Sequence, residues 1–174
     1  MTKRGFNTNT KNEQEWLTPP EIISALGPFF LDPCSPPHSR RIRDTAHIHW
    51  SLEEHGDGLS KEWFGRVWLN PPYGRETFKW LAKLAEHGSG IALIFARTET
   101  SGFHSEIWQK ADSVFFFKGR LSFGLTGTGK APGRCNAPSC LVSYSLEDTG
   151  RIMAAQHSGD LAGKLVILKG VSNG

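Results

Sequence analysis

The sequence of 174 residues lacks long apolar runs, paired cysteines and a metal-ligand motif. It contains no run of about 20 apolar residues that could span a bilayer, and its polar N-terminus lacks the apolar segment of a signal peptide. Its three cysteines, Cys34, Cys135 and Cys140, are odd in number and wrongly spaced for a disulfide framework or a structural zinc site. We therefore expect a cytoplasmic protein with reduced thiols and no bound metal.

Acidic residues are missing from one long interval, between Asp112 and Glu147. The formal net charge of +3 is too small to indicate a nucleic-acid binder by itself, but this interval carries only basic charges. They are Lys118, Arg120, Lys130 and Arg134. Each one alone is an ordinary solvated side chain, whereas the group on a glycine-rich segment favours contact with phosphates.

Alternating apolar and amphipathic segments predict the fold class. A flexible basic tail is expected over residues 1–14, followed by a single domain over 15–174. The stretch TPPE matches a capping box with Thr18 as N-cap, which predicts a helix to about Leu26. Strands are expected at 29–32, 47–50, 66–69, 90–96 and 113–119, and helices at 75–87, 101–111 and 148–156.

This alternation, with apolar strands covered on both faces, predicts an α/β doubly wound sheet that is mostly parallel. The last part of the chain departs from the pattern. Residues 119–124 and 139–145 flank a glycine- and proline-rich loop, so we expect a terminal antiparallel hairpin there.

Two other motifs carry little weight. Residues 124–131, GLTGTGKA, differ from the phosphate-binding consensus because Ala131 replaces the hydroxyl that would hold Mg²⁺, and prolines follow where a helix should begin. Four histidines, His38, His47, His49 and His55, lie near Cys34 but match no ligand spacing. A flexible loop and solvated or core histidines are the better interpretations.

The stretch RVWLNPPYG, residues 66–74, indicates a functional site. Pro71 and Pro72 fix φ and lack an N–H group, so the strand must end there and Asn70 lies on a rigid turn. Two aspartates accompany it. Asp32 ends the strand FFLD, at the edge where open α/β sheets bind ligands, and Asp57 precedes the strand of Asn70. Alone, Asp32 is more typical of a helix cap or a turn, and Asp57 of a plain Asp-Gly turn.

Taken in order, TPP, LDP, DGL and NPPYG resemble the S-adenosylmethionine-dependent DNA adenine-N6 methyltransferases, most closely the small phage-encoded Dam family. The similarity extends from about Trp16 to Tyr144 and includes ARTET and GRLSF. It implies a Rossmann-like S-adenosylmethionine methyltransferase fold over residues 15–174, double-stranded DNA as partner, and the cytoplasm of a bacterial host for a phage-encoded protein.

The resemblance also implies roles for individual residues. The catalytic motif would comprise Asn70, Pro71, Pro72 and Tyr73. Thr18 and Pro19 would approach the methionine end of the cofactor, Asp32 with Pro33 its amino group, and Asp57 its adenosine portion. Given the basic interval described above, we also expect DNA contacts from Arg97, Lys118, Arg120, Lys130 and Arg134.

The chemistry of adenine explains why such a motif is needed. The exocyclic amine is a poor nucleophile because its lone pair is delocalised into the ring. The Asn70 amide oxygen and the Pro71 carbonyl can accept its two N–H bonds and stabilise the positive charge that develops during methyl transfer. The base must be flipped out of the duplex, and Tyr73 offers a ring on which it can stack.

Two alternatives remain at this stage. An NPPY motif also suits a protein-glutamine or RNA amine methyltransferase, because the geometric demand is similar. A non-catalytic nucleic-acid-binding module is the other, since Cys34, Ser35, Pro36 and Pro37 replace the glycine-rich loop that often follows the first strand of methyltransferases.

Overall fold

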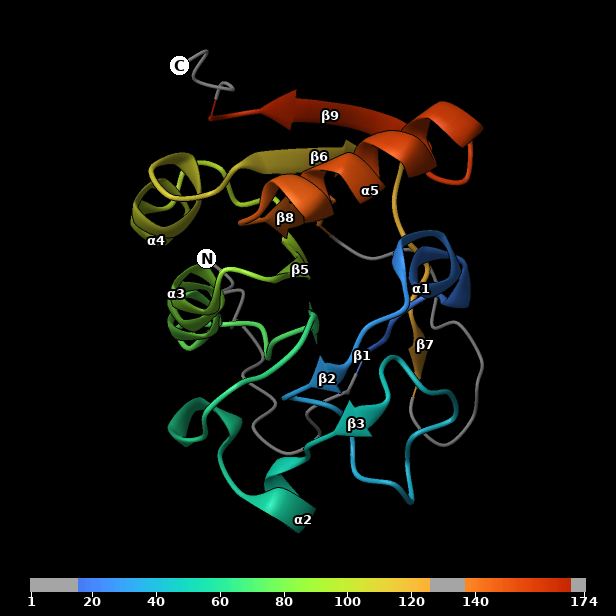
Figure 1. Ribbon diagram of the computed structural model, residues 1–174, viewed down its shortest axis with the longest axis vertical. Helices are drawn as coiled ribbons and strands as arrows, with labels where there is room; N and C mark the ends of the chain where they lie inside the picture. Colours follow the sequence, from blue (N-terminus) through green and yellow to red (C-terminus); the bar gives the residue numbers. More distant parts are fainter. Residues whose placement is uncertain (1–15, 126–136, 170–174) are drawn as a thin grey trace, which may run out of the picture.

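The computed structural model describes residues 16–125 and 137–169 (Figure 1). Several segments discussed above lie outside these residues: the expected tail, most of the stretch 124–131, Lys130, Arg134 and Cys135. The main sheet has the strand order β3-β2-β4-β5-β8-β6-β9. Its strands are β2 (Leu31–Asp32), β3 (Ile48–His49), β4 (Val67–Leu69), β5 (Gly90–Phe95), β6 (Ser113–Phe117), β8 (Ser139–Ser143) and β9 (Gly163–Ile167).

Helices connect these strands; those over residues 20–26, 77–87, 101–108 and 146–158 lie where the sequence predicts helices, whereas the short helices at 52–55 and 58–60 were not predicted. The helices are α1 (Pro20–Leu26), α2 (Leu52–His55), the 3-10 helix η1 (Gly58–Ser60), α3 (Thr77–His87), α4 (Ser101–Phe103), the π-helix η2 (His104–Trp108) and α5 (Leu146–Ser158). α3 ends at Gly88, whose φ of 74° gives the left-handed cap that glycine favours. Every helix in the described part of the chain is too short or too polar to span a bilayer.

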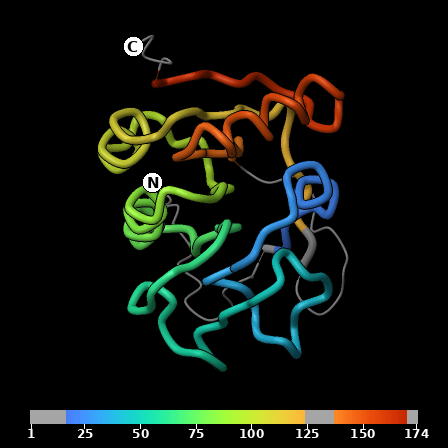
Figure 2. Tube along the Cα trace, viewed as in Figure 1, coloured from blue at the N-terminus to red at the C-terminus, as the bar shows by residue number. Residues whose placement is uncertain are grey.

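The sheet is parallel on one side and antiparallel on the other, which confirms the α/β class. β3, β2, β4 and β5 are mutually parallel. β8 is inserted between β5 and β6 and is antiparallel to both, so β6 runs in the same direction as β5. β9 closes the far edge, antiparallel to β6. The tube view shows these two ends of the sheet at opposite ends of the molecule (Figure 2).

The predicted terminal hairpin has different partners in the structure. The strand at residues 139–143 pairs with β5 and β6, not with residues 119–124. Instead β7 (Gly124–Leu125) pairs with β1 (Trp16–Leu17) in a separate two-stranded antiparallel sheet. The reason is burial: β8 is buried along its whole length, and the central gap between β5 and β6 gives it two partners rather than one.

The predicted capping box at Thr18 is also wrong. The N-cap of α1 is Pro19, no side chain caps this end, and Pro20 occupies the first turn, where its missing N–H costs nothing. The Thr18 hydroxyl contacts Trp68 and Asn70 instead.

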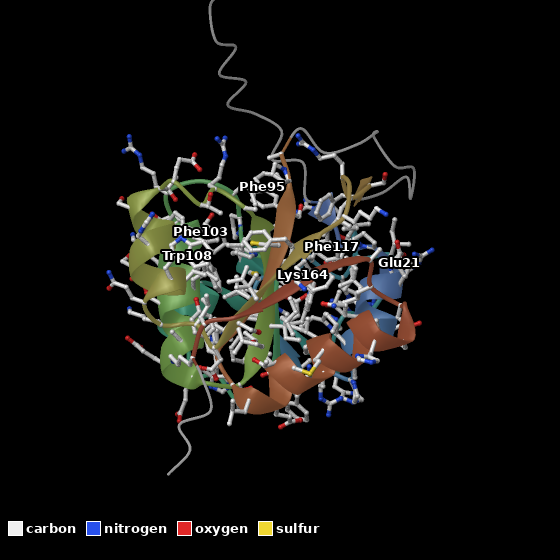
Figure 3. All side chains as sticks on the ribbon, turned by 90° about the horizontal axis from the view of Figure 1, so that it is seen from above. Glu21, Phe95, Phe103, Trp108, Phe117 and Lys164 are labelled. Carbon is white, nitrogen blue, oxygen red and sulfur yellow. The ribbon has the colours of Figure 1, made fainter. Side chains whose placement is uncertain are left out.

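Helices cover both faces of the sheet (Figure 1). Alternate strand residues point to opposite sides: Val67 and Leu69 pack with α3, α4 and η2, whereas Trp68 packs with α1 and α5. In the view from above, Phe103 and Trp108 lie on one side of the sheet, and Phe117 and Glu21 lie toward the other (Figure 3). Two apolar cores therefore hold the strands between them.

A buried ion pair joins α5 to the beginning of β4. Arg66 Nε donates to Asp148 Oδ1 at 2.6 Å, and the Asp148 side chain is 1% exposed. The second carboxylate oxygen accepts the Gly90 N–H at 2.7 Å and the Ser145 hydroxyl at 2.6 Å. Asp148 therefore ties together β4, β5 and the start of α5.

Replacing Asp148 tests the contribution of these interactions to stability. Asp148→Ala leaves a buried guanidinium without its counter-ion, which typically costs about 3–5 kcal/mol of unfolding free energy. The control is Glu147→Ala, whose exposed carboxylate pairs with Arg151 and whose loss should cost about 0.3–0.5 kcal/mol. Urea unfolding measures both, and equal losses would contradict the structural role of Asp148.

Candidate functional site

The site forms where the direction of strand addition reverses. The chain passes from β2 outward to β3, then returns to place β4 on the other side of β2. β2 and β4 are parallel, with Leu31 opposite Val67, so their carboxyl ends lie at the same edge. Asp32 ends one strand and Asn70 follows the other. Open α/β sheets bind their ligands at this kind of switch point.

One cavity of about 1080 Å³ opens at this edge. The structure brings together around it all but one of the predicted catalytic and cofactor-binding residues. Its lining includes Thr18, Asp32, Pro33, Asp57, Asn70, Pro71, Pro72 and Tyr73. Pro19 does not line it and is buried at the start of α1. A smaller depression of about 550 Å³ between α1 and residues 44–47 contains none of the predicted residues.

Both the side chain and the backbone of Asn70 are held by hydrogen bonds. Its side-chain Nδ2 donates to the Thr18 hydroxyl at 3.4 Å, and its backbone carbonyl accepts from the Cys34 thiol at 3.3 Å. The Thr18 oxygen also accepts from Trp68 Nε1 at 3.3 Å. The residue is therefore fixed by contacts from the segment before α1 and from the loop after β2.

The NPPY turn is closed by the first residue of α3. Thr77 Oγ1 donates to the Pro72 carbonyl at 2.6 Å and accepts the Gly74 N–H at 3.1 Å. Gly74 has a φ of 137°, which few other residues adopt. The two prolines and this closed turn together leave the backbone at Asn70 and Pro71 little freedom.

Tyr73 is stacked on Phe95, which the sequence analysis did not single out. The ring centroids are 3.9 Å apart and the planes are inclined by 11°. Tyr73 lines the cavity, and Phe95 is not among the lining residues. Phe95 lies within the apolar run of β5, where its sequence pattern is that of an ordinary core residue.

Asp32 is a buried carboxylate with a raised pKa. Its side chain accepts the Cys34 N–H at 3.3 Å and the hydroxyl of Thr45, yet burial outweighs these contacts and raises its pKa from 3.8 to about 6. The same burial raises the pKa of the Cys34 thiol. A cationic ligand group beside Asp32 would offset the cost of its ionisation.

Asp57 has a local role. Its side chain accepts the Leu59 N–H at 2.9 Å and caps η1, while the Gly58 carbonyl accepts from the buried Trp63 indole at 2.9 Å. The carboxylate is exposed at the mouth of the cavity. The structure therefore shows Asp57 as the cap of η1, and its predicted contact with a ligand stays a prediction.

Three of the predicted DNA-binding residues lie in the described part of the chain, and they share one edge of the sheet. Arg97 follows β5, and Lys118 and Arg120 follow β6; because these strands run in the same direction, their ends lie at the edge that holds Asn70. All three side chains are exposed, and Arg97 lies 3.8 Å from Glu99. On the other side of the cavity, Arg40, Arg41 and Arg43 contribute to its lining.

Metal ligands are not clustered in the described ranges: no group of three His, Cys, Asp or Glu side chains could hold an ion. His49 Nε2 accepts the backbone N–H groups of Thr45 and Ala46 at 3.1 and 3.2 Å, and burial lowers its pKa to about 4. It acts there as a neutral acceptor that shapes the loop before β3.

A switch-point cavity with an NPPY turn on one strand and a buried carboxylate on its neighbour defines a candidate amine methyltransferase. The model of the DNA N-6-adenine-methyltransferase (Dam) family matches residues 5–162, so the chain belongs to this family.

A curated relative has the same description. The DNA N-6-adenine-methyltransferase of Escherichia phage T1 is 28% identical over 168 residues, which cover 91% of this chain and 65% of that protein. The chain thus spans less than two thirds of the length of this relative. No solved structure matches the chain significantly.

The raised pKa of Asp32 predicts how the stability of the protein changes with pH. Between pH 3.8 and about 6 the folded protein binds this proton more tightly than the unfolded chain does, so the contribution of Asp32 to stability falls as pH rises through that window. Above pH 7 the buried charge costs about 2–3 kcal/mol. Asp32→Asn should therefore be more stable than the parent at pH 8 and similar to it at pH 3.5.

Urea unfolding of both proteins across pH 3.5–8 measures this difference. Asp160→Asn, which alters an exposed carboxylate, is the matched control for the change of side chain. A difference between Asp32→Asn and the parent that stays constant with pH would show that the Asp32 pKa is not raised.

Proposed function

We propose that residues 15–174 form one methyltransferase domain that transfers a methyl group from S-adenosylmethionine to the N6 amine of a flipped adenine in double-stranded DNA. The observation that carries the proposal is the meeting of Asp32 and Asn70 at one cavity, with the NPPY turn at its wall. Family membership supports adenine in DNA as the substrate. The sheet order from β3 to β5 supports the Rossmann-like assignment.

The residues of the cavity fit the proposed cofactor. Asp32 is a buried acid whose ionisation needs a cationic partner, and the cofactor carries an ammonium group. Gly58 packs so closely on the Pro33 carbonyl that a Cβ would lie 2.2 Å from its oxygen, so only glycine lets η1 approach the end of β2. This close packing shapes the wall without the glycine-rich loop, whose place Cys34 to Pro37 take.

When bound, S-adenosylmethionine would supply the methyl group from its sulfonium sulfur, which would become a thioether sulfur. The protein's part is to hold the adenine amine in line with that carbon. Asn70 Oδ1 and the Pro71 carbonyl accept the two N6–H bonds, which frees the nitrogen lone pair to form the new bond. The resulting positive charge faces two fixed dipoles, and the surplus proton leaves afterwards to solvent.

Tyr73 provides the surface for the flipped base. One face of its ring packs on Phe95, so the adenine stacks on the face directed to the cavity. Stacking on an aromatic side chain contributes roughly 1–3 kcal/mol per base. Phe95 prevents the Tyr73 ring from turning away, so the base meets a ring that is already positioned.

The duplex would lie along the carboxyl edge of the sheet. Arg97, Lys118 and Arg120 stand on one side of the cavity, and Arg40, Arg41 and Arg43 stand on the other. Basic side chains on both sides can bind the phosphates that flank an extruded nucleotide. We place Lys130 and Arg134 in the same interface, and the protein in the cytoplasm of a bacterial host.

The alternatives from the sequence are less well supported. A glutamine amide or an RNA amine would suit the NPPY turn, but the family that matches nearly the whole chain acts on DNA adenine. A binding module without catalysis would not need a buried acid beside a rigid pair of acceptors.

The direct test is incubation with methyl-tritiated S-adenosylmethionine and unmethylated bacterial DNA, followed by identification of the modified base. The parent should form N6-methyladenine. Asn70→Ala should lose at least about a hundredfold in turnover, because it removes an acceptor of the transition state, while it retains the cofactor. Asp32→Ala is the matched control and should weaken cofactor binding instead.

Methylation of RNA or protein but not DNA would refute the substrate assignment. Turnover of Asn70→Ala within a few-fold of the parent would refute the role of Asn70. Unchanged affinity of Asp32→Ala for the cofactor, measured by calorimetry, would refute the cofactor site.

The salt dependence of DNA binding tests the interface. If Lys118 and Arg120 each neutralise one phosphate, replacing both with alanine should reduce the slope of log K against log salt by about two units. The control is Lys110→Ala with Lys169→Ala, which removes the same charge at the opposite edge, where Lys169 pairs with Asp112 at 3.0 Å. Equal effects of the two double variants would place the DNA elsewhere.

A further inference from the structure

We infer that Thr18 is a positioning residue for catalysis: its hydroxyl orients the Asn70 amide so that the oxygen, not the nitrogen, faces the adenine amine. The inference rests on the proposed function. It differs from the role that the sequence resemblance implies for Thr18, which is contact with the cofactor. The observation that carries it is the hydrogen bond from Asn70 Nδ2 to Thr18 Oγ1, 3.4 Å long.

The orientation of the amide decides whether Asn70 can act. Only Oδ1 can accept an N–H of the adenine amine. The nitrogen side of the Asn70 amide carries two N–H groups, which can only donate. Rotation by 180° about the last side-chain bond exchanges the two. A planar amide whose nitrogen is held by Thr18 must direct its oxygen away from Thr18, and Asn70 borders the cavity.

The Thr18 hydroxyl is itself held firmly. It accepts from the indole of Trp68, which is fully buried and can only donate. On its N-terminal side, Leu17 pairs with Gly124 in the sheet of β1 and β7. On its C-terminal side, Pro19 and Pro20 restrict the backbone at the start of α1. The acceptor therefore has a fixed position before any ligand binds.

A second contact holds the backbone of Asn70 independently of its side chain. The Cys34 thiol donates to the Asn70 carbonyl at 3.3 Å, and the following prolines stiffen the turn. The position of the Asn70 backbone thus does not depend on Thr18. What Thr18 adds is the orientation of the amide, so its removal should affect turnover more than folding or DNA affinity.

The experiment compares Thr18→Val, which keeps the shape but removes the hydroxyl, with Thr18→Ser, which keeps the hydroxyl. Single-turnover methylation of unmethylated bacterial DNA should slow by about tenfold in Thr18→Val, the effect of one lost neutral hydrogen bond, and recover most of the rate in Thr18→Ser. The dissociation constant for S-adenosylmethionine should stay within twofold of the parent value.

A spectroscopic readout is independent of activity. In protein labelled with [¹⁵N]asparagine, the side-chain NH₂ signals of Asn70 are those missing from Asn70→Ala. They should shift and exchange faster with water in Thr18→Val but not in Thr18→Ser. Because Thr18→Val also leaves the Trp68 indole without its acceptor, Trp68→Phe is the folding control. It should lower the melting temperature with a smaller loss of rate than Thr18→Val.

The outcomes distinguish the proposed function from the role of Thr18. If the parent transfers no methyl group to DNA, the proposed function fails, and the NH₂ signals still decide whether Thr18 holds Asn70. Unchanged NH₂ signals in Thr18→Val would overturn the inference. A weaker affinity for S-adenosylmethionine with an unchanged rate at saturation would overturn it as well and assign Thr18 to the cofactor.

Discussion

The hydrogen-bonded contact between β2 and β4 is the constraint on which the candidate site depends. The Phe30 and Leu31 N–H groups both donate to the Arg66 carbonyl, at 2.7 and 3.3 Å. Because the two strands are parallel, this contact brings Asp32 and Asn70 to the same edge although they lie far apart in the sequence. Asp148 holds the Arg66 side chain, so α5 secures the base of the strand that carries the NPPY turn.

The site combines a costly charge with rigid dipoles. Burial raises the pKa of Asp32, and the protein therefore holds a destabilising group where a cationic ligand would relieve the cost. Asn70 and Pro71 need no change of protonation, since their oxygens are acceptors at every pH. In the proposed reaction, rigidity would take the place of proton transfer; it comes from the prolines, Thr77 and the Tyr73–Phe95 stack.

Local patterns were sufficient to predict most elements of the fold. The spacing in α3 with Gly88 after it, and the apolar run of β5, are signals that need no distant partner. The failures involve long-range competition. Thr18 fits a helix cap by local spacing, but Trp68 and Asn70 provide donors for its hydroxyl some fifty residues away. Likewise, β8 pairs inside the sheet because two buried neighbours stabilise it more than one hairpin partner would.

For the candidate site as well, local motifs were predictable and long-range contacts were not. The motifs predicted which side chains border the cavity, because strand ends in open α/β sheets have a known relation to ligands. They gave no indication of Phe95 or Cys34, whose importance comes from the residues that they touch. Phe95 has the sequence environment of a core residue, and only the 3.9 Å stack distinguishes it.

The insertion of β8 has a consequence for the order of folding during synthesis. Within the sheet, β8 lies between β5 and β6 and pairs with both, and it leaves the ribosome long after the NPPY turn. The four parallel strands can associate early, but the edge of β5 that carries Phe95 stays unpaired until residues 139–143 are made, and Arg66 lacks its counter-ion until Asp148 follows. A nascent chain interrupted before β8 would expose the apolar edge of β5, a surface that chaperones bind and that favours aggregation.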